Sequence, residues 1–151
     1  MNRAREELRG RLRPEVEPAE AVLVLRGGPD TVPKLQTHAR RTARAWCLDG
    51  APLFGISVFC ALDDIGPASL PGLLGGRLLT YRCFHRCTVG ELQDLGVHLL
   101  PTGHRPHFTA VIESDEGAEL QRLLACLGHP RENPYRNLST RGRGGGDRDG
   151  R

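Results

Sequence analysis

Residues 78–87, LLTYRCFHRC, carry tyrosine, arginine, cysteine and histidine within ten consecutive positions. These residue types bind metals, supply nucleophiles and bases, or contact nucleic acids. The aromatic and β-branched residues among them favour a β-strand. A strand here would place Cys83, His85 and Cys87 on one face and Arg82 on the other. The chemistry that this stretch can support therefore depends on the distances along a strand.

Strand geometry argues against a metal site in this stretch. Successive residues on one face are about 6.6 Å apart, so Cys83 and Cys87 would be roughly 13 Å apart. A Zn–S bond is only about 2.3 Å long, so one zinc ion does not reach both sulfur atoms. We therefore predict that the two cysteines pack as small apolar side chains and that the chain has no metal site.

Histidine and arginine side chains elsewhere in the chain could bind one ligand together. Imidazoles transfer protons near neutral pH, and guanidiniums bind phosphate through paired N–H donors. Arg26 ends an expected strand just before two glycines, and His38 and Arg41 fall on one side of the helix that follows. These groups could converge on an anion beside a helix start, and the alternative is a solvated helix flank beside an ordinary turn. The candidate catalytic residues are His38, His85 and His107, and the candidate phosphate-binding residues are Arg26, Arg41 and Arg82.

The elements that must position these residues follow from apolar patterns and capping signals. Strands are expected over 19–28, 52–62, 77–86, 97–102 and 106–113. Helices are expected over 31–46, 88–96 and 114–128, with a short helical turn over 67–76. Thr88 and Glu91 form a capping-box pattern, and Gly128 and Pro130 end the last helix. The order predicts an α+β fold: a single domain with a mixed β-sheet of about five strands.

Charge and composition divide the chain into three parts. Residues 1–13 carry a net charge of +3 and residues 139–151 carry +2, so the part between them has a net charge of −2. We expect a basic N-terminal helix and linker over 1–18, the α+β domain over 19–138, and a disordered Gly/Arg-rich tail over 139–151. A near-neutral body argues against a surface that grips duplex nucleic acid along its length.

Composition also limits the setting in which the protein works. No apolar run of 18 residues is present, which predicts no membrane span, and the first residues lack the apolar core of a secretory signal. Five cysteines without an export signal favour reduced thiols and a cytoplasmic location. Nothing in the chain matches a known nucleotide loop, and no cofactor is expected.

Three resemblances add to these predictions. The segments LVLRGGPDT, GISVF, LDDIGPAS, LTYR and LPTGHRPHFT resemble a set of small actinobacterial proteins with no assigned activity. The strand PHFTAVI is similar to one of the two H-x-T strands of 2H phosphoesterases. The order of Arg26, Ser57 and then Glu113 or Glu116 is similar to the R-S-E order of ADP-ribosyltransferases, which implies action on a nucleotide.

These observations favour a small cytosolic bacterial enzyme that acts on RNA or a nucleotide phosphate, in a toxin or defence role. Its histidines would transfer protons and its arginines would hold phosphate. Two alternatives stay open. One is a non-catalytic module that binds a protein partner through the basic N-terminal helix. The other is a nucleic-acid-binding accessory protein, which the near-neutral body disfavours.

Overall fold

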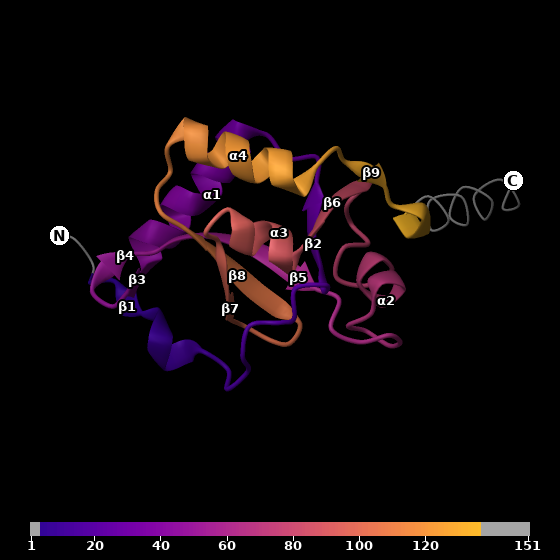
Figure 1. Ribbon diagram of the computed structural model, residues 1–151, viewed down its shortest axis with the longest axis horizontal. Helices are drawn as coiled ribbons and strands as arrows, with labels where there is room; N and C mark the ends of the chain where they lie inside the picture. Colours follow the sequence, from indigo (N-terminus) through magenta and orange to yellow (C-terminus); the bar gives the residue numbers. More distant parts are fainter. Residues whose placement is uncertain (1–3, 137–151) are drawn as a thin grey trace, which may run out of the picture.

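A computed structural model describes residues 4–136 and shows a six-stranded sheet as the centre of the fold (Figure 1). Its strands are β2 (Leu23–Gly28), β5 (Phe54–Cys60), β6 (Cys83–Thr88), β7 (His98–Pro101), β8 (His107–Ile112) and β9 (Arg131–Glu132). The spatial order is β7-β8-β5-β2-β6-β9. The predicted α+β fold is confirmed, and each of the five expected strands is present in this sheet. The expected tail, 139–151, lies outside the described residues.

The pairing within this sheet differs from the mixed sheet that we expected. Every neighbouring pair of its strands is antiparallel. Between α1 (Val32–Ala45) and β5, the short strands β3 (Trp46–Leu48) and β4 (Ala51–Pro52) form a hairpin. Asp49 and Gly50 make its turn with positive φ angles of 51° and 84°. The chain enters β5 from the β4 side of this hairpin and runs antiparallel to β2.

A second, small sheet contains the mixed pairing. Its order is β1-β3-β4, in which β1 (Glu6–Glu7) runs parallel to β3 and β4 runs antiparallel to it. The pairings extend over only two residues each. Strands this short carry too little alternation for a sequence pattern to reveal them.

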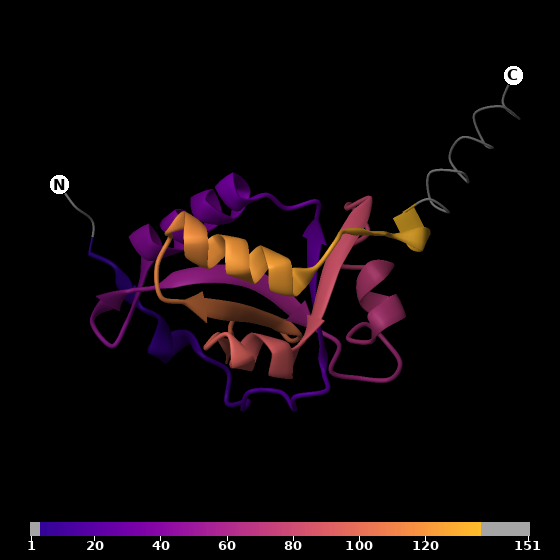
Figure 2. The same ribbon diagram turned by 45° about the horizontal axis from the view of Figure 1, so that its top comes forward.

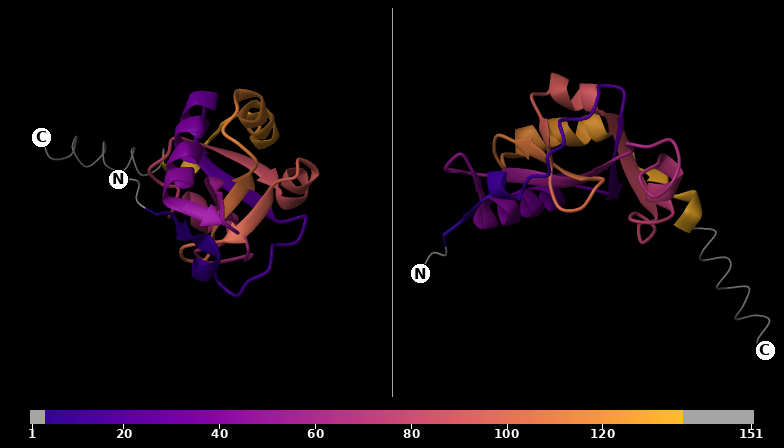
Figure 3. Two further views of the ribbon diagram at one scale, coloured as in Figure 1. Left: turned by 90° about the vertical axis from the view of Figure 1, so that its left-hand side faces the viewer. Right: turned by 90° about the horizontal axis from the view of Figure 1, so that it is seen from below.

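Helices cover both faces of the large sheet. The remaining ones are α2 (Leu70–Leu74), α3 (Val89–Asp94) and α4 (Gly117–Leu127). Figures 1 and 2 show α1 and α4 side by side on one face, where they close the main core around Ile56 and Phe108. On the other face, α2 closes a smaller core with Leu25 and Phe84. It lies at the end of the molecule away from β3 and β4 (Figure 3).

Local capping interactions begin the helices where the sequence predicts. The Thr88 side chain accepts from the Glu91 backbone N–H, and the Glu91 carboxylate accepts from the Thr88 backbone N–H, so the predicted capping box is confirmed. Ser69 caps α2 by accepting from Gly72 N–H. The last helix ends at Gly128, whose φ is 76°. Such a positive φ suits glycine.

The N-terminal segment is not the basic helix that we expected. Among residues 4–18 only Leu8–Arg11 is helical, as a four-residue 3₁₀ turn, and Leu8 is buried. The segment instead pairs with β3 and bonds to the body. Arg5 Nε donates to Ala43 O at 2.6 Å, and Arg13 Nη1 donates to Thr102 O at 2.7 Å. A helix this short has no stability of its own in water, so contacts with the body decide its shape.

Gly28 supplies a test of the packing between β2 and β6. A Cβ atom at Gly28 would meet the His85 ring at 2.8 Å, and that ring is held by hydrogen bonds at both nitrogens. We expect Gly28→Ala to lower the free energy of unfolding by about 1–3 kcal/mol, measured by urea denaturation, because the ring has no room to move. Gly10→Ala is the control, since no atom lies within 4 Å of the added methyl. Equal effects of the two changes would contradict this account.

Candidate functional site

The candidate site lies where two central strands separate. Strand β5 pairs with β8 over six residues, but it pairs with β2 only at Val24↔Cys60 and Leu25↔Phe59. Beyond that point β2 stays paired with β6 along its whole length. On the edge of β5 that faces away from β8, the backbone groups of Gly55 and Ser57 therefore have no neighbouring strand among residues 4–136 to bond with.

Three side chains take the place of the missing strand. Arg26 Nη1 donates to Ser57 O at 2.7 Å, and Ser57 N donates to His38 Nε2 at 3.2 Å. Thr42 Oγ1 donates to Gly55 O at 2.9 Å. Buried backbone polar groups require such partners. The separation of the strands thus fixes an arginine, a histidine and a serine in one place.

Arg26 is further oriented by an ion pair. Its Nε donates to Asp30 Oδ2, and the two side chains are only 15% and 5% exposed. Asp30 follows the turn that leaves β2, and its backbone N–H donates to His85 Nε2 at 3.0 Å. The guanidinium is therefore held between a carboxylate and the Ser57 carbonyl.

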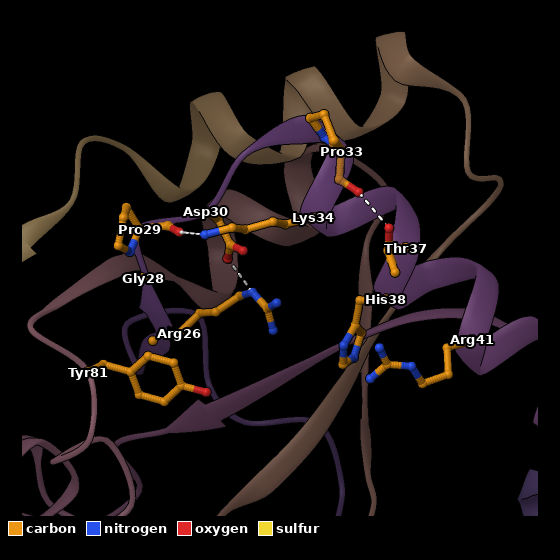
Figure 4. Close-up of a pocket in the computed structure, with 11 residues that line it drawn as sticks. Arg26, Gly28, Pro29, Asp30, Pro33, Lys34, Thr37, His38, Arg41 and Tyr81 are labelled. Carbon is orange, nitrogen blue, oxygen red and sulfur yellow. Dashed lines mark hydrogen bonds and ion pairs between the residues drawn. The ribbon is translucent and has the colours of Figure 1, made fainter.

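A cleft of about 620 Å³ opens beside this arrangement. Figure 4 shows Arg26, Lys34, His38 and Arg41 around it, with Tyr81 on the side opposite α1. Lys34 Nζ donates to the Pro29 carbonyl at 3.2 Å. Three cationic side chains and the one Asp30 carboxylate give the cleft a net positive charge, which suits an anionic ligand.

A smaller cavity of about 280 Å³ adjoins the cleft, because both are lined by His38 and Arg41. Ser57, His107 and Thr109 also line it. His107 Nε2 is hydrogen-bonded to Ser57 Oγ. The geometry places a hydroxyl group and an imidazole in direct contact at the wall of a cationic site.

The hydrogen bonds of His107 define its tautomer. Its Nδ1 lies 3.1 Å from Thr102 O and 3.0 Å from Thr102 Oγ1. A carbonyl oxygen only accepts, so Nδ1 carries the proton and Nε2 accepts from the Ser57 hydroxyl. A nucleophile, a base and a group that orients the base are the parts of a Ser-His hydrolytic site. Here the orienting group is a backbone carbonyl.

The electrostatic surroundings keep His107 uncharged. Burial lowers its pKa, and the guanidiniums of Arg13 and Arg77 lower it further, while the hydrogen bond to the Thr102 carbonyl acts in the opposite direction. The Phe59 ring lies edge-on to the imidazole, with centroids 5.3 Å apart. A neutral imidazole is the form that acts as a general base.

His38 positions the backbone of Ser57. Burial, with the nearby guanidiniums of Arg26 and Arg41, lowers its pKa to about 4. Because its Nε2 already accepts from Ser57 N–H, the ring holds the nucleophile's backbone in place. His38 is thus neutral at pH 7, with its proton on Nδ1.

The lowered pKa of His38 predicts a pH dependence of stability. The unfolded chain has a His pKa of about 6.5 and so binds the proton first as pH falls. The contribution of His38 is therefore complete above about pH 6.5 and is lost as pH falls towards 4. Urea unfolding should show a larger stability difference between the natural chain and His38→Gln at pH 7 than at pH 4.5. An unchanged difference would contradict the burial of a neutral ring.

The other two candidate residues lie outside the cleft. His85 is 1% exposed, and its Nδ1 donates to Gly128 O at 2.8 Å. With Nε2 bonded to Asp30 N–H, both ring nitrogens are used to join the turn after β2 to the end of α4. Arg82 is exposed and precedes β6, because the strand begins only at Cys83. The structure thus brings together Arg26, His38 and Arg41, with His107 in the adjoining cavity.

Sequence reasoning gave no catalytic or binding role to several members of the site, and it named Ser57 only within the R-S-E resemblance. Ser57 is a lone hydroxyl residue in the apolar strand FGISVFC, and this was the signal that could have marked it. Thr102 and Tyr81 were expected on the strands over 97–102 and 77–86. The structure places them just outside β7 and β6, where the alternation of a strand no longer fixes the direction of a side chain. Glu113, one of the two glutamates considered for the R-S-E order, follows the Phe54↔Ile112 pair and lines a separate cavity with Asp94; Glu116, the other, does not line the cleft or the small cavity.

Within residues 4–136, no group of three His, Cys, Asp or Glu side chains is arranged to hold a metal ion. None of the helices in this part of the chain is long and apolar enough to cross a membrane. No family model, curated protein or solved structure matches the chain.

Proposed function

We propose that this protein is an enzyme that acts on a phosphate ester of RNA or a nucleotide. The observation that carries the proposal is the chain of contacts Ser57–His107–Thr102, in which Ser57 and His107 line the small cavity that adjoins the cationic cleft. Such an enzyme would fit the bacterial toxin or defence role that the sequence suggests. The proposal combines two features: the Ser57 hydroxyl bonded to an imidazole, and the cationic side chains of the neighbouring cleft.

The cations support binding of a phosphate group. Arg26 uses Nε and Nη1 for Asp30 and Ser57, and no group among residues 4–136 takes its Nη2. Arg41 is exposed at the junction of the two cavities and pairs with no carboxylate in the described part of the chain. Guanidinium groups bind phosphate oxygens through charge-assisted hydrogen bonds. A phosphate at this junction would lie beside Ser57.

The chemistry follows from the order of contacts. Ser57 Oγ attacks phosphorus and passes its proton to His107 Nε2 as the new O–P bond forms. The bond from phosphorus to the leaving oxygen breaks, and His107 returns the proton to that oxygen. Water then attacks this phosphorus and gives its proton to His107 as the Ser57 Oγ–P bond breaks. His107 returns the proton to Ser57 Oγ, and the product leaves as a phosphomonoester when the substrate is a phosphodiester. Arg41 stabilises the charge that develops on the phosphoryl oxygens.

The structure weakens the alternative of a partner-binding basic helix. Arg5, Arg9 and Arg13 are bonded to Ala43, Asp49 and Thr102 of the same chain. Each of these guanidiniums already donates to another part of the same chain, so a partner that used these donors would have to displace the contacts.

A covalent probe tests the proposal directly. We expect an alkyl fluorophosphonate to form an adduct at Ser57, detected by peptide mass spectrometry, and inorganic phosphate to compete with it. Ser114 is the matched control, because its hydroxyl donates to the Glu119 carboxylate and has no imidazole partner. Equal labelling of Ser57 and Ser114, or no hydrolysis of a phosphodiester such as bis(4-nitrophenyl) phosphate, would overturn the proposal.

A further inference from the structure

Three cavities around Ser57 follow one another along α1, each sharing lining residues with the next, and together they are called the groove. The cleft and the small cavity share His38 and Arg41, and the small cavity shares Trp46 and His107 with a third cavity of about 450 Å³. The residues of α1 that line the groove run from Pro33 to Ala45, the last residue of the helix. At 1.5 Å per residue this is a length of about 18 Å. The groove therefore extends well to both sides of the Ser57–His107 pair.

An aromatic ring stands at the end of the groove near the helix start. A Cβ atom at Gly27 would meet three atoms of the Tyr81 ring at 2.5–2.6 Å, so the ring lies directly over the glycine. Tyr81 is nevertheless 44% exposed and lines the cleft (Figure 4). One face of the ring is thus supported by backbone. An exposed, supported ring beside cations is a platform on which a nucleobase stacks.

A second aromatic ring stands at the other end. Trp46 follows the last turn of α1 and lines both the small and the third cavity, together with Leu53 in the latter. The guanidinium of Arg11 lies 5.5 Å from the centroid of its ring. The third cavity is more apolar in lining than the cleft and holds no carboxylate among its lining residues. It offers an aromatic wall and a cation to a second base.

We propose that the groove binds single-stranded nucleic acid, with one base on Tyr81 and the next beside Trp46. The phosphodiester between the two bases then lies at Arg41, next to Ser57 and His107. This inference rests on the proposed function and specifies its substrate. Alternating cations and aromatic rings are the pattern by which proteins hold unpaired strands. A duplex would keep its bases stacked away from both rings.

The single tryptophan of the chain makes the second base observable. Trp46 is the only tryptophan in the sequence, so intrinsic fluorescence reports this end of the groove alone. Binding is measured on the full chain carrying Ser57→Ala, so that the probe is not cleaved. The probes are the dinucleotide ApA, AMP and inorganic phosphate. We expect ApA to bind at least about tenfold more tightly than AMP and to quench Trp46, whereas AMP leaves the fluorescence unchanged.

The Tyr81 platform is tested with matched variants. Tyr81→Ala should weaken binding of both ApA and AMP by about tenfold and leave inorganic phosphate binding unchanged, as expected for loss of one stacked base. Tyr81→Phe keeps the ring and should bind like the parent. Loss of phosphate binding in Tyr81→Ala would show that the ring only supports the fold of the cleft, and would overturn its role in stacking.

The outcomes separate this inference from the proposed function. Equal affinities for ApA and AMP with no change in Trp46 fluorescence would overturn the two-base groove, while phosphate binding and Ser57 labelling would still support the enzyme. Absence of binding by all three probes, together with absence of Ser57 labelling, would overturn the proposed function and the inference with it.

Discussion

Replacing His107 with glutamine is expected to lower kcat/KM for phosphodiester hydrolysis at least about a hundredfold, because general-base catalysis contributes 10²–10⁴-fold. Glutamine fills much of the same space and can hydrogen-bond to Ser57, but it does not take up a proton. His107 lines a cavity rather than the core, so the variant should keep its fold, checked by circular dichroism. The assay is steady-state hydrolysis of bis(4-nitrophenyl) phosphate.

A matched histidine and a double variant complete this test. His98→Gln changes an exposed histidine on β7 that lines none of the three cavities, and it should hydrolyse the substrate like the natural chain. Ser57→Ala should lose as much activity as His107→Gln. Residues that act as a unit are non-additive, so the double variant should be no slower than either single one. Multiplied losses would contradict a Ser-His pair.

The pH dependence of kcat/KM provides an independent test of His107 as the general base. Burial lowers the pKa of His107, so the neutral base predominates at neutral pH and the rate falls at a lower pH than it would for an ordinary histidine. The acid side of the kcat/KM profile should therefore reflect a pKa below 6.5. A rate that falls with an apparent pKa above 6.5 would show that His107 is not the group that titrates.

Interactions between residues close in sequence account for what the sequence predicted well. The Thr88–Glu91 capping box and the Ser69 cap each span three residues, so the pattern contains the whole interaction. The stripe that buries Leu120 and Leu127 in α4 depends only on helical periodicity. Likewise Arg26, His38 and Arg41 converge because one turn and one helix connect them.

Long-range register explains what the sequence could not predict. Ser57 meets His107 because β5 and β8, 50 residues apart, pair with Ser57 opposite Thr109. No single-sequence pattern specifies that register. The buried position of His85 depends on Asp30 N–H and Gly128 O, which come from two other parts of the chain. Its residue type suggested catalysis, whereas its partners make it a structural link.

A second large effect, on stability, is expected from breaking the ion pair between Arg26 and Asp30, which lines the cleft. Arg26→Leu removes the partner of an Asp30 side chain that is 5% exposed. We expect the free energy of unfolding at pH 7 to fall by about 3–5 kcal/mol, because an unpaired charge stays buried. Urea denaturation measures the loss. Arg82→Leu is the control, since Arg82 is exposed, and it should change stability by no more than about 0.5 kcal/mol.

Removing the buried charge as well should restore part of this loss. The double variant Arg26→Leu/Asp30→Leu no longer buries a lone carboxylate, so it should unfold at higher urea concentration than Arg26→Leu alone. Recovery is incomplete because Ser57 O still lacks the donor that Arg26 Nη1 supplied at 2.7 Å, and an unpaired buried carbonyl costs about 1–3 kcal/mol. A double variant no more stable than Arg26→Leu would assign the loss to the Ser57 contact. The gap between β2 and β5, rather than the ion pair, would then be the feature that Arg26 stabilises.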